Sequence, residues 1–330
     1  MTLLITGGAG FIGSNLVRLA LERGDEVVTL DALTYAGSQE NLDGLTADQH
    51  QFVKGNIADK ETVEQVIRNG FHGRRFDAVI NCAAETHVDR SLVVATSFAE
   101  SNVLGTAVLL ETARRFEIPT FLQVSTDEVY GSITGDGKFT RQSPFRPSSP
   151  YSASKACADL FTLSFYHSWG YDVRITRCTN NYGPYQFPEK FIPVIITNAL
   201  LGKKIPVYGD GLNIRDWIYV RDHCDGILKT LETGKAATVY HFGGSNEQTN
   251  IDLSKHICRL LAQEVGKNEE EFLSLITFVD DRPGHDRRYA LDWSDSETEL
   301  GWQPTTSWEE GLRTTIRWYL HNTGWWETKL

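Results

Sequence analysis

Short apolar runs alternate with longer amphipathic segments through roughly the first 180 residues, and no other feature of the sequence constrains the fold as strongly. The apolar runs predict strands over residues 3–6, 26–30, 51–54, 78–82, 120–124 and 172–176. The longer segments predict helices over 11–23, 60–69, 97–116 and 150–168. Strands joined by helices of this length form parallel sheets with helices on both faces. The sequence therefore predicts an α/β fold with a doubly wound parallel sheet of the Rossmann type.

The strict alternation ends near residue 180, where prolines become frequent. The run VYHFGG at 239–244 could return to the sheet as a strand. Two later segments indicate a smaller C-terminal lobe, GHDRRYALD at 284–292 and the helical pattern SWEEGLRTTIRWYLHN at 307–322. We therefore expect residues 1–180 to form the sheet domain, with some later segments returning to it. Residues 181–330 are expected to form mainly the second lobe.

Charge, cysteine content and hydropathy exclude several classes of protein. The chain has a net charge of -11, whereas a surface that binds nucleic acid needs a basic face. Its five cysteines show no CxxC pair, so we expect neither a disulfide framework nor a metal site. No apolar stretch approaches the ~20 residues of a membrane span, and the chain start shows no export signal. We expect a cytoplasmic protein with reduced thiols that binds neither nucleic acid nor membrane.

The segment TGGAGFIGSN at 6–15 follows the first predicted strand and opens the first predicted helix. Gly7, Gly10 and Gly13 have the spacing of a turn whose backbone N–H groups can approach a pyrophosphate. Asp31 ends the second strand, close to the ~20-residue distance expected for a carboxylate that accepts from a ribose 2′-hydroxyl. Because a carboxylate repels a 2′-phosphate, the pattern indicates NAD rather than NADP. A turn that only packs the helix on the strand is the alternative.

Two further strands are followed by residues that could line the same cofactor site. Asn56-Ile57 come after the third strand, and Ala83-Ala84 come after the fourth. The carboxyl ends of parallel strands meet at one edge of a sheet, where open α/β folds bind their ligands. Position alone therefore allows a cofactor contact at both pairs, and it allows plain loop packing equally.

A tyrosine and a lysine lie near the start of the predicted helix 150–168. Ser148 or Ser149 is the expected N-cap, and Tyr151 and Lys155 then lie one turn apart on one helical face. An ammonium beside a phenol favours the phenolate and lowers the pKa of the tyrosine. The pair therefore predicts a base that can deprotonate a hydroxyl. A Tyr-x-x-x-Lys pair also occurs as an ordinary surface contact on helices.

Two adjacent carboxyl groups follow the strand 120–124, within the segment STDEVYG. Thr126, Asp127 and Glu128 fall at the carboxyl end of a central strand, which is where such sheets bind ligands. Adjacent carboxyl groups can act as an acid and a base if their environments separate their pKa values. The alternative interpretation is a solvated acidic turn.

Seven motifs carry a resemblance to one family: GGAGFIG, AAETHVDRS, STDEVYG, YSASK, NNYGPYQFPEK, YGDGLNIRDW and DRPGHDRRYALD. The chain resembles the NDP-glucose 4,6-dehydratases of the extended short-chain dehydrogenase/reductase superfamily over nearly its whole length. The glycine turn and Tyr-x-x-x-Lys specify only the superfamily, whereas Thr-Asp-Glu followed by Tyr-x-x-x-Lys is much narrower. The resemblance implies tightly bound NAD as the cofactor. It also implies a homodimer that forms through helices near 97–116 and 150–168.

The reaction that the resemblance implies is the dehydration of dTDP-glucose to dTDP-4-keto-6-deoxyglucose. Tyr151 would take the proton of the C4 hydroxyl while hydride passes from C4 to NAD, and Thr126 would hold the C4 oxygen. Glu128 would then remove the C5 proton and Asp127 would protonate the departing C6 hydroxyl, after which hydride returns to C6 and a proton to C5. Lys155 would also reach the nicotinamide ribose. The implied catalytic residues are Thr126, Asp127, Glu128, Tyr151 and Lys155.

The resemblance also assigns binding residues. The segment LTYAG at 33–37 matches the adenosine side of the family, whereas Asn56 replaces a carboxylate that the family often has. The cofactor-binding set is Gly7, Gly10, Phe11, Ile12, Gly13, Asp31, Leu33, Thr34, Asn56, Ile57, Ala83, Ala84, Tyr151 and Lys155. An acidic protein needs local cations to hold a diphosphate, and Arg215 and Arg282 are expected to supply them. The substrate-binding set is His87, Thr126, Asn180, Glu189, Lys190, Arg215 and Arg282.

Other functions are compatible with parts of this pattern. UDP-glucose could replace dTDP-glucose, because the nucleotide base is recognised by a pocket that motifs do not define. An NAD-dependent sugar-nucleotide epimerase shares the glycine turn, the Tyr151 and Lys155 pair and Arg215, but it has no need of Asp127 and Glu128. A regulatory protein that senses the cofactor could keep the fold and lose the chemistry. The intact set of catalytic residues argues against that last alternative.

Overall fold

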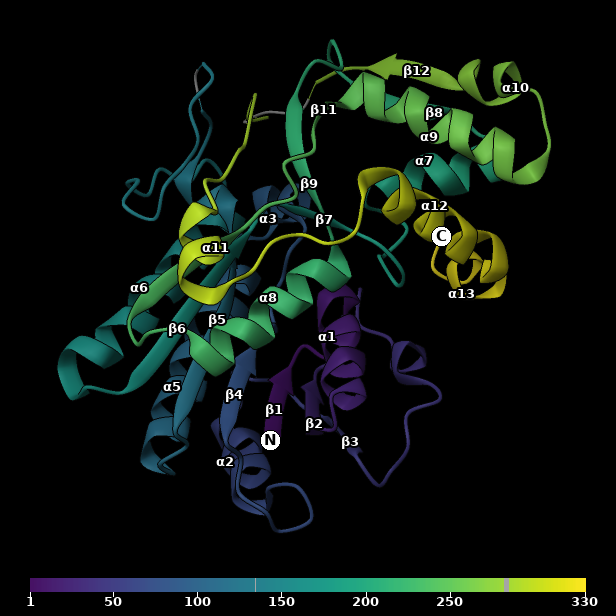
Figure 1. The fold of residues 1–330 in the computed structure, drawn as a ribbon. Coiled ribbons are helices and arrows are strands. Elements are labelled where there is room, and N and C mark those ends of the chain that lie inside the picture. Colours follow the sequence, from purple (N-terminus) through teal and green to yellow (C-terminus); the bar gives the residue numbers. More distant parts are fainter. Residues whose placement is uncertain (134, 282–284) are drawn as a thin grey trace.

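The computed structural model describes residues 1–133, 135–281 and 285–330, and a seven-stranded sheet lies at its centre (Figure 1). The strand order is β10-β6-β5-β4-β1-β2-β3, and all neighbouring strands are parallel. The strands are β1 (Thr2–Thr6), β2 (Glu26–Asp31), β3 (His50–Lys54), β4 (Ala78–Asn81), β5 (Thr120–Thr126), β6 (Asp172–Cys178) and β10 (Thr238–Phe242). This sheet confirms the predicted doubly wound α/β fold.

Helices cover both faces of the sheet (Figure 1). On one face lie α1 (Phe11–Glu22) and α8 (Val220–Thr233), and on the other lie α2 (Lys60–Asn69), α5 (Gly105–Arg115) and α6 (Pro150–Trp169). The shorter helical elements of this part are η1 (Gln39–Leu42), α3 (Val88–Val93), α4 (Ala95–Phe98), η2 (Ala99–Leu104) and η3 (Asp127–Tyr130). Within the described ranges, no helix has the length and apolar character that crossing a membrane requires.

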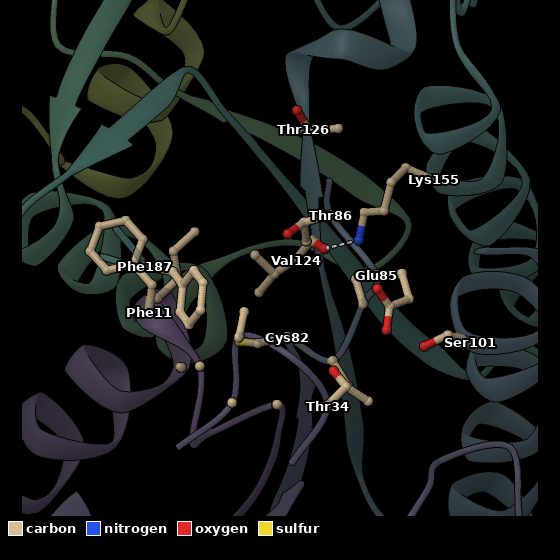
Figure 2. A pocket seen from close by; sticks show the side chains of 18 of the residues that line it. Phe11, Thr34, Cys82, Glu85, Thr86, Ser101, Val124, Thr126, Lys155 and Phe187 are labelled. Carbon is tan, nitrogen blue, oxygen red and sulfur yellow. Dashed lines mark hydrogen bonds between the residues drawn. The ribbon is translucent and has the colours of Figure 1, made fainter. Parts of the chain in front are cut away.

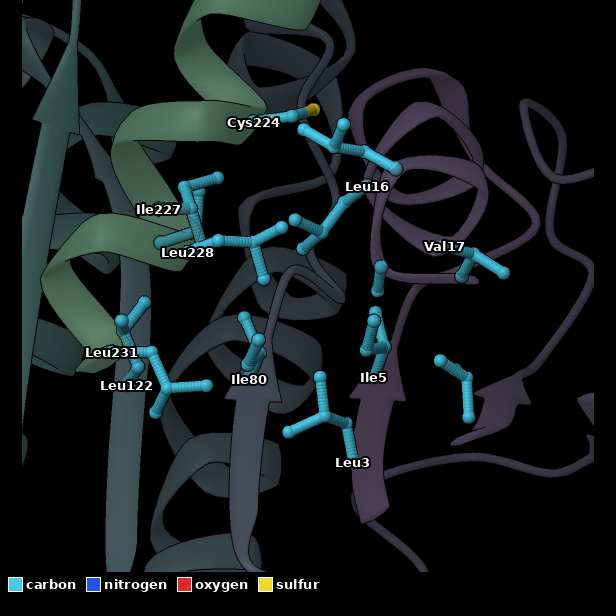
Figure 3. Close-up of a cluster of buried hydrophobic side chains, with 14 of the residues drawn as sticks. Leu3, Ile5, Leu16, Val17, Ile80, Leu122, Cys224, Ile227, Leu228 and Leu231 are labelled. Atoms are coloured by element: carbon cyan, nitrogen blue, oxygen red, sulfur yellow. The ribbon is translucent and has the colours of Figure 1, made fainter. Parts of the chain in front are cut away.

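Apolar side chains from the sheet and from α1 and α8 form one continuous core (Figure 3). Leu3 and Ile5 of β1 and Ile80 of β4 lie in this core with Leu16 of α1 and Ile227 of α8, and all five side chains are fully buried. Each such side chain contributes about 1.5–3 kcal/mol by leaving water. Because α8 comes from the second half of the sequence, this core joins the two halves of the chain.

The second half of the chain also builds a smaller lobe, which lies beyond the carboxyl ends of the main strands (Figure 1). It contains a three-stranded sheet, β11-β9-β7, and a two-stranded sheet, β12-β8. Its strands are β7 (Asn180–Tyr182), β8 (Ile205–Tyr208), β9 (Ile214–Tyr219), β11 (Glu247–Thr249) and β12 (Ile276–Val279). Its helices are α7 (Phe191–Leu200), α9 (Asn250–Val265), α10 (Glu269–Leu273), α12 (Trp308–His321) and α13 (Thr323–Glu327), while α11 (Ser294–Leu300) packs beside β10.

The predicted helix over 97–116 is the one element whose local structure differs clearly from the sequence expectation. The structure divides this region into α4, the π-helical turn η2 and α5. Asn102 lies in η2 and uses its side chain in tertiary contacts, since its Nδ2 donates to Ser154 Oγ at 2.8 Å and its Oδ1 accepts from the Glu85 N–H at 2.8 Å. Such π-turns inside helices occur frequently at functional sites.

Candidate active site

A cleft opens at the carboxyl ends of β1, β2, β4 and β5, with part of the second lobe on its far side (Figure 2). It encloses about 300 Å³, at the lower end of the range of about 300–1,000 Å³ for ligand pockets. The strand order reverses between β1 and β4, and open α/β sheets bind ligands at such a switch point. The predicted residues that line it are Gly7, Gly10, Phe11, Ile12, Gly13, Asp31, Thr34, Asn56, Ile57, Ala83, Ala84, Thr126, Asp127, Glu128, Tyr151, Lys155, Asn180 and Lys190.

The glycine turn forms the floor of the cleft between β1 and α1. Gly7 has a φ of +68°, and a β-carbon there would lie 2.6 Å from the backbone of Ala83. A β-carbon on Gly13 would lie 2.1 Å from the Gly7 carbonyl oxygen. Gly10 caps α1 without a side-chain hydrogen bond, so the first N–H groups of the helix are directed at the cleft. This cradle of backbone amides suits a pyrophosphate.

Asp31 stands at the end of β2, on the same edge of the sheet. Its side chain is buried and accepts from the Ala9 N–H at 2.9 Å and from the Leu33 N–H at 2.8 Å. Burial raises the pKa of Asp31, and the two backbone hydrogen bonds oppose that rise. Leu33 does not line the cleft, but its N–H orients this carboxyl group. The carboxyl group is therefore held where a ribose hydroxyl could donate to it.

Helix α6 presents Tyr151 and Lys155 to the cleft because of how it begins. Ser149 and Ser152 form a capping box, in which Ser149 Oγ accepts from the Ser152 N–H at 3.1 Å and Ser152 Oγ accepts from the Ser149 N–H at 3.0 Å. The ammonium of Lys155 points back to β5, where it donates to the Val124 carbonyl at 2.7 Å (Figure 2). The cap and this contact fix the orientation of the first two turns of α6.

The direction of the pKa shift at Tyr151 differs from the sequence prediction. Burial raises the pKa of Tyr151 well above its usual value, and Glu128 raises it further, while a hydrogen bond with Thr126 has the opposite effect. Burial also lowers the pKa of Lys155, which Asp159 partly opposes. The described residues therefore do not produce the expected low pKa of the phenol, because burial and a nearby carboxyl group both disfavour a negative phenolate.

The two adjacent carboxyl groups lie at the point where β5 ends and the short helix η3 begins. Thr126 caps η3, since its Oγ1 accepts from the Glu128 N–H at 3.3 Å. The same hydroxyl lies 3.3 Å from Asp127 Oδ1, to which it can donate. Burial raises the pKa of Asp127 well above its usual value, and the charge of Glu128 adds to this, while Arg215 opposes it. Asp127 therefore favours the protonated form, in which a carboxyl group can donate a proton.

The predicted substrate residues divide between the cleft and its rim. Asn180 lines the cleft, and its buried Oδ1 has no hydrogen-bond partner within the part of the chain that the structure describes. Lys190 also lines the cleft, and its Nζ donates to the Thr86 carbonyl at 3.4 Å. Glu189 lies beside it and pairs with His87 Nε2 at 3.3 Å. His87 and Glu189 are partly exposed at the rim and do not line the cleft itself.

Of the two arginines predicted to bind the diphosphate, only Arg215 belongs to the residues that the structure describes. Arg215 lies on β9 with only 6% of its surface exposed, and its guanidinium stacks over the Tyr289 ring at 4.5 Å. It donates to the Ile214 carbonyl at 2.7 Å and to the Asp286 carbonyl at 2.8 Å. Its positive charge opposes the rise in the pKa of Asp127, which lines the cleft. Arg282 lies outside the described residues.

Several residues of the cleft were not anticipated from the sequence. Tyr35, Cys82, Glu85, Cys178 and Phe187 line it. Cys82, Glu85 and Tyr35 are direct neighbours of predicted residues in the chain, so extending each motif by one position would have found them. Phe187 lies on the loop between β7 and α7, whose path the local pattern does not define. Among the described side chains, no group of three or more His, Cys, Asp or Glu residues could hold a metal ion.

Known proteins resemble this chain over nearly its whole length. A model of the protein family described as GDP-mannose 4,6 dehydratase matches residues 4–315. A dTDP-glucose 4,6-dehydratase from Xanthomonas campestris pv. campestris is 48% identical, over 98% of this chain and 94% of its own length. The structure of DesIV, a dTDP-glucose 4,6-dehydratase from Streptomyces venezuelae with NAD and TYD bound, is 46% identical with a TM-score of 0.92 and full coverage of both chains. A UDP-glucose 4-epimerase from Thermotoga maritima is 29% identical with a TM-score of 0.87, over 98% of this chain and 100% of its own.

A doubly wound sheet with a glycine turn, a Tyr-x-x-x-Lys helix and a lobe over the strand ends defines an extended short-chain dehydrogenase/reductase that acts on nucleotide sugars. Within that class, the high sequence identity with dTDP-glucose 4,6-dehydratases shows the family, and the paired carboxyl groups of η3 are compatible with it. The chain belongs to the dTDP-glucose 4,6-dehydratase family.

Proposed function

We propose that this chain dehydrates dTDP-glucose to dTDP-4-keto-6-deoxyglucose with NAD as its cofactor. The observation that carries the proposal is the meeting of Asp127 and Glu128 with Tyr151 and Lys155 in one cleft beside the glycine turn. The dTDP-glucose 4,6-dehydratases among the relatives and the NAD in the related DesIV structure support the substrate and the cofactor. The reaction makes the enzyme a hydro-lyase.

The residues of the cleft fit NAD. The backbone amides after Gly10 would hold the pyrophosphate, Asp31 would accept from the adenosine ribose, and Thr34, Asn56 and Ile57, which line the cleft, would lie on the adenosine side. When bound, NAD supplies a hydride acceptor and donor, and its nicotinamide carries the positive charge that a phenolate needs nearby. The small side chains of Ala83 and Ala84 would leave room for the cofactor, and Lys155 would donate to its nicotinamide ribose.

The protons of the reaction are moved by the side chains of β5, η3 and α6. Tyr151 accepts the proton of the C4 hydroxyl as C4 is oxidised, and Thr126 holds the same oxygen. The new carbonyl group acidifies the hydrogen on C5, which Glu128 removes. Asp127 protonates the leaving hydroxyl of C6, a role that suits its raised pKa. The elimination therefore requires two carboxyl groups in different protonation states.

The substrate extends from the cleft toward the second lobe. Asn180 and Lys190, which line the cleft, and Arg215, which is buried on β9, are assigned to the diphosphate, and Arg282 is proposed from the sequence. His87 and Glu189 are proposed to contact the sugar or nucleoside at the rim. In this arrangement residues 1–180 carry mainly the cofactor and residues 181–330 mainly the substrate.

Two alternatives are weighed against this assignment. An epimerase is favoured by the likeness to the Thermotoga maritima enzyme, but that likeness is 29% identity against 46–48% for the dehydratases. An epimerase also has no use for a raised pKa at Asp127 beside Glu128. UDP-glucose dehydration differs only in the base of the substrate, and the identity of the relatives favours dTDP.

The proposal is tested by incubating the protein with dTDP-glucose, UDP-glucose and CDP-glucose and measuring the alkaline ultraviolet absorbance of the 4-keto product. We expect the dTDP sugar to react fastest. Glu128→Gln should retain bound NAD and lose dehydration by about 100-fold or more, because general acid–base catalysis contributes roughly 10²–10⁴-fold. Full dehydration by Glu128→Gln would refute the role of Glu128, and a 4-epimerised sugar as the product would refute the assigned reaction.

We also propose that two chains associate through η2 and α6 and that the protein is cytoplasmic. Leu104 of η2 and Leu160 and Phe161 of α6 are 51%, 55% and 43% exposed, which is unusual for large apolar side chains on helices packed against each other. Covering this face with a second copy removes it from water. The cytoplasmic location is supported by cysteines that are all free thiols.

A further inference from the structure

A network of buried polar side chains lies directly behind the η3 turn and outside the cleft. Tyr130 is the last residue of η3 and has 1% of its surface exposed. Its hydroxyl accepts a hydrogen bond from Arg177 Nη1 of β6 and lies 2.7 Å from His241 Nε2 of β10. None of these three residues lines the cleft. The reaction steps described above therefore leave the network without a role.

The proton positions in this network follow from its neighbours. His241 Nδ1 lies 3.0 Å from the Asp292 carbonyl oxygen, which can only accept, so Nδ1 carries the hydrogen. The other ring nitrogen, Nε2, is then an acceptor, and the Tyr130 hydroxyl donates to it. Burial lowers the pKa of His241 to about 3, and the charge of Arg177 contributes. The imidazole therefore stays neutral and the direction of each hydrogen bond is fixed.

The same network reaches the helix that carries Tyr151 and Lys155. Arg177 Nε donates to Asp159 Oδ2 at 2.8 Å, and the two side chains are 2% and 0% exposed. Asp159 is one turn beyond Lys155, which is one turn beyond Tyr151, so all three lie along one face of α6. A continuous chain of buried hydrogen bonds thus joins α6 to the turn that carries the two carboxyl groups.

Stability alone is a poor explanation for this network. A buried ion pair loses much of its attraction to desolvation, and apolar replacements of similar size are often as stable. Aromatic rings enclose the Arg177 guanidinium, which lies 4.8 Å from the Tyr130 ring centre and 4.7 Å from that of Phe145. Within the described residues Asp159 Oδ1 has no hydrogen-bond partner, whereas Asp159 Oδ2, Arg177, Tyr130 and His241 are joined by hydrogen bonds. What such a buried hydrogen-bonded chain supplies is one defined geometry. The geometry held here is that of η3 relative to α6.

We propose that Tyr130, Arg177, His241 and Asp159 are positioning residues that hold Asp127 and Glu128 in register with Tyr151 across the sugar. The inference rests on the proposed function, because it assigns the network to the elimination of water. Tyr151 and Lys155 keep their own supports, the capping box and the Val124 carbonyl. Loosening the network at Tyr130 therefore misplaces the two carboxyl groups and leaves the oxidation of C4 intact.

The test uses Tyr130→Phe in the full-length protein with NAD and dTDP-glucose. C4 oxidation is followed in single turnovers by the absorbance of reduced nicotinamide, and elimination by the appearance of the 4-keto-6-deoxy product. We expect elimination to slow by about 10- to 100-fold, since a misplacement of ~1 Å can cost ~100-fold, while oxidation changes by less than about twofold. The reduced-nicotinamide signal should consequently last longer than in the unmodified protein.

Tyr240→Phe is the matched control, because Tyr240 precedes His241 on β10 and is equally buried. Its hydroxyl bonds away from η3, donating to Glu299 Oε2 at 3.1 Å. Loss of the hydroxyl should leave both steps unchanged. If Tyr130→Phe fails to fold, His241→Phe keeps a ring of similar size and removes the acceptor of the Tyr130 hydroxyl. The same selective loss of elimination is expected from it.

The outcomes distinguish failure of the positioning role from failure of the proposed function. Selective slowing of elimination in Tyr130→Phe or His241→Phe supports the positioning role. Equal slowing of both steps, or rates like those of the unmodified protein, overturns that role while the proposed function stands. An unmodified protein that forms no 4-keto product overturns the proposed function, and the positioning role fails with it.

Discussion

At the scale of single residues, Asp127 shows how the surroundings of a carboxyl group decide its chemistry. The sequence places it beside Glu128, and the role of the acid was assigned to Asp127 only through the resemblance to a family. In the structure Asp127 is 3% exposed, and burial raises its pKa more than any other cause. Glu128 and Asp216 raise the pKa further, and Arg215 and the Thr126 hydroxyl lower it. The protonated form is thus favoured at Asp127.

This environment predicts a dependence of stability on pH. Above the usual pKa of 3.8 the unfolded protein ionises Asp127 while the folded protein keeps it protonated, so the folded state binds more protons. The stability of the unmodified protein relative to Asp127→Asn should therefore fall as pH rises, by up to about 1.4 kcal/mol per pH unit, until the folded pKa is reached. Urea unfolding of both proteins at several pH values measures this difference.

Asp210→Asn is the control, because the pKa of Asp210 is shifted in the opposite direction to that of Asp127. Asp210 is exposed, and its pKa is lowered first by the hydrogen bond from Arg287. The stability that this carboxylate contributes is present above the unfolded pKa and is lost as pH falls through the folded pKa.

Parallel pH profiles for the unmodified protein and Asp127→Asn would show that the Asp127 pKa is not raised.

At the scale of elements, α6 has two faces with different tasks. Its inner face carries Tyr151, Lys155 and Asp159, while its outer face exposes Leu160 and Phe161. The amphipathic pattern of the sequence predicted the helix, but it did not separate these faces, because both contain apolar residues. The packing of α6 on η2 and β5 decides which side is left exposed.

The exposed face makes a prediction about assembly. Leu160→Glu places a charge at the centre of the proposed contact between two chains, so we expect the mass measured by sedimentation to fall from dimer to monomer. Burying one such leucine stabilises the contact by about 1.5–3 kcal/mol. In a symmetric dimer Leu160 of both chains is buried, so this stabilisation is gained twice. Leu201→Glu is the control, because Leu201 is 40% exposed beyond α7 in the other lobe. A dimer that survives Leu160→Glu would argue for a different contact.

At the scale of the whole molecule, the C-terminus is connected to the glycine turn. Trp325 of α13 donates through Nε1 to Asn41 Oδ1 at 2.8 Å, and Asn41 Nδ2 donates to the Ala9 carbonyl at 2.8 Å. The Ala9 N–H in turn donates to Asp31. A terminal helix therefore supports the peptide that lies in the middle of the proposed cofactor site. Only the folded chain brings these residues together.

This connection predicts that Trp325→Phe releases NAD faster. The variant keeps an aromatic ring against Trp318 and Tyr185 and loses one hydrogen bond, which is worth about 0.5–1.5 kcal/mol. We expect release to accelerate by roughly 2- to 12-fold on that basis, measured as the NAD that remains bound after gel filtration. Trp318→Phe is the control from the same aromatic cluster. Equal NAD retention in both variants and the unmodified protein would exclude the connection as a support.

The alternation of apolar runs was enough to predict the six strands of residues 1–180, each with bounds correct to within about two residues. This was possible because the spacing of apolar residues that distinguishes a strand from a helix is a local property of the sequence. The glycine turn, Asp31 and the paired motifs of β5 and α6 were readable for the same reason. They depend on spacing along the chain, and the doubly wound order brings strand ends to one edge. The sequence by itself therefore determined the sheet, the candidate cofactor site and the chemical groups of the cleft.

What only the tertiary structure decided depends on burial and on partners far along the chain. The pKa of Tyr151 is raised where the local pair predicted a lowered value, because burial and the charge of Glu128 both raise it. The π-turn at Asn102 follows from contacts with Glu85 and Ser154. The network behind Tyr130 needs residues from three other elements. Desolvation and long-range hydrogen bonds have no signature in local sequence, and they set the geometry in which the catalytic groups are held.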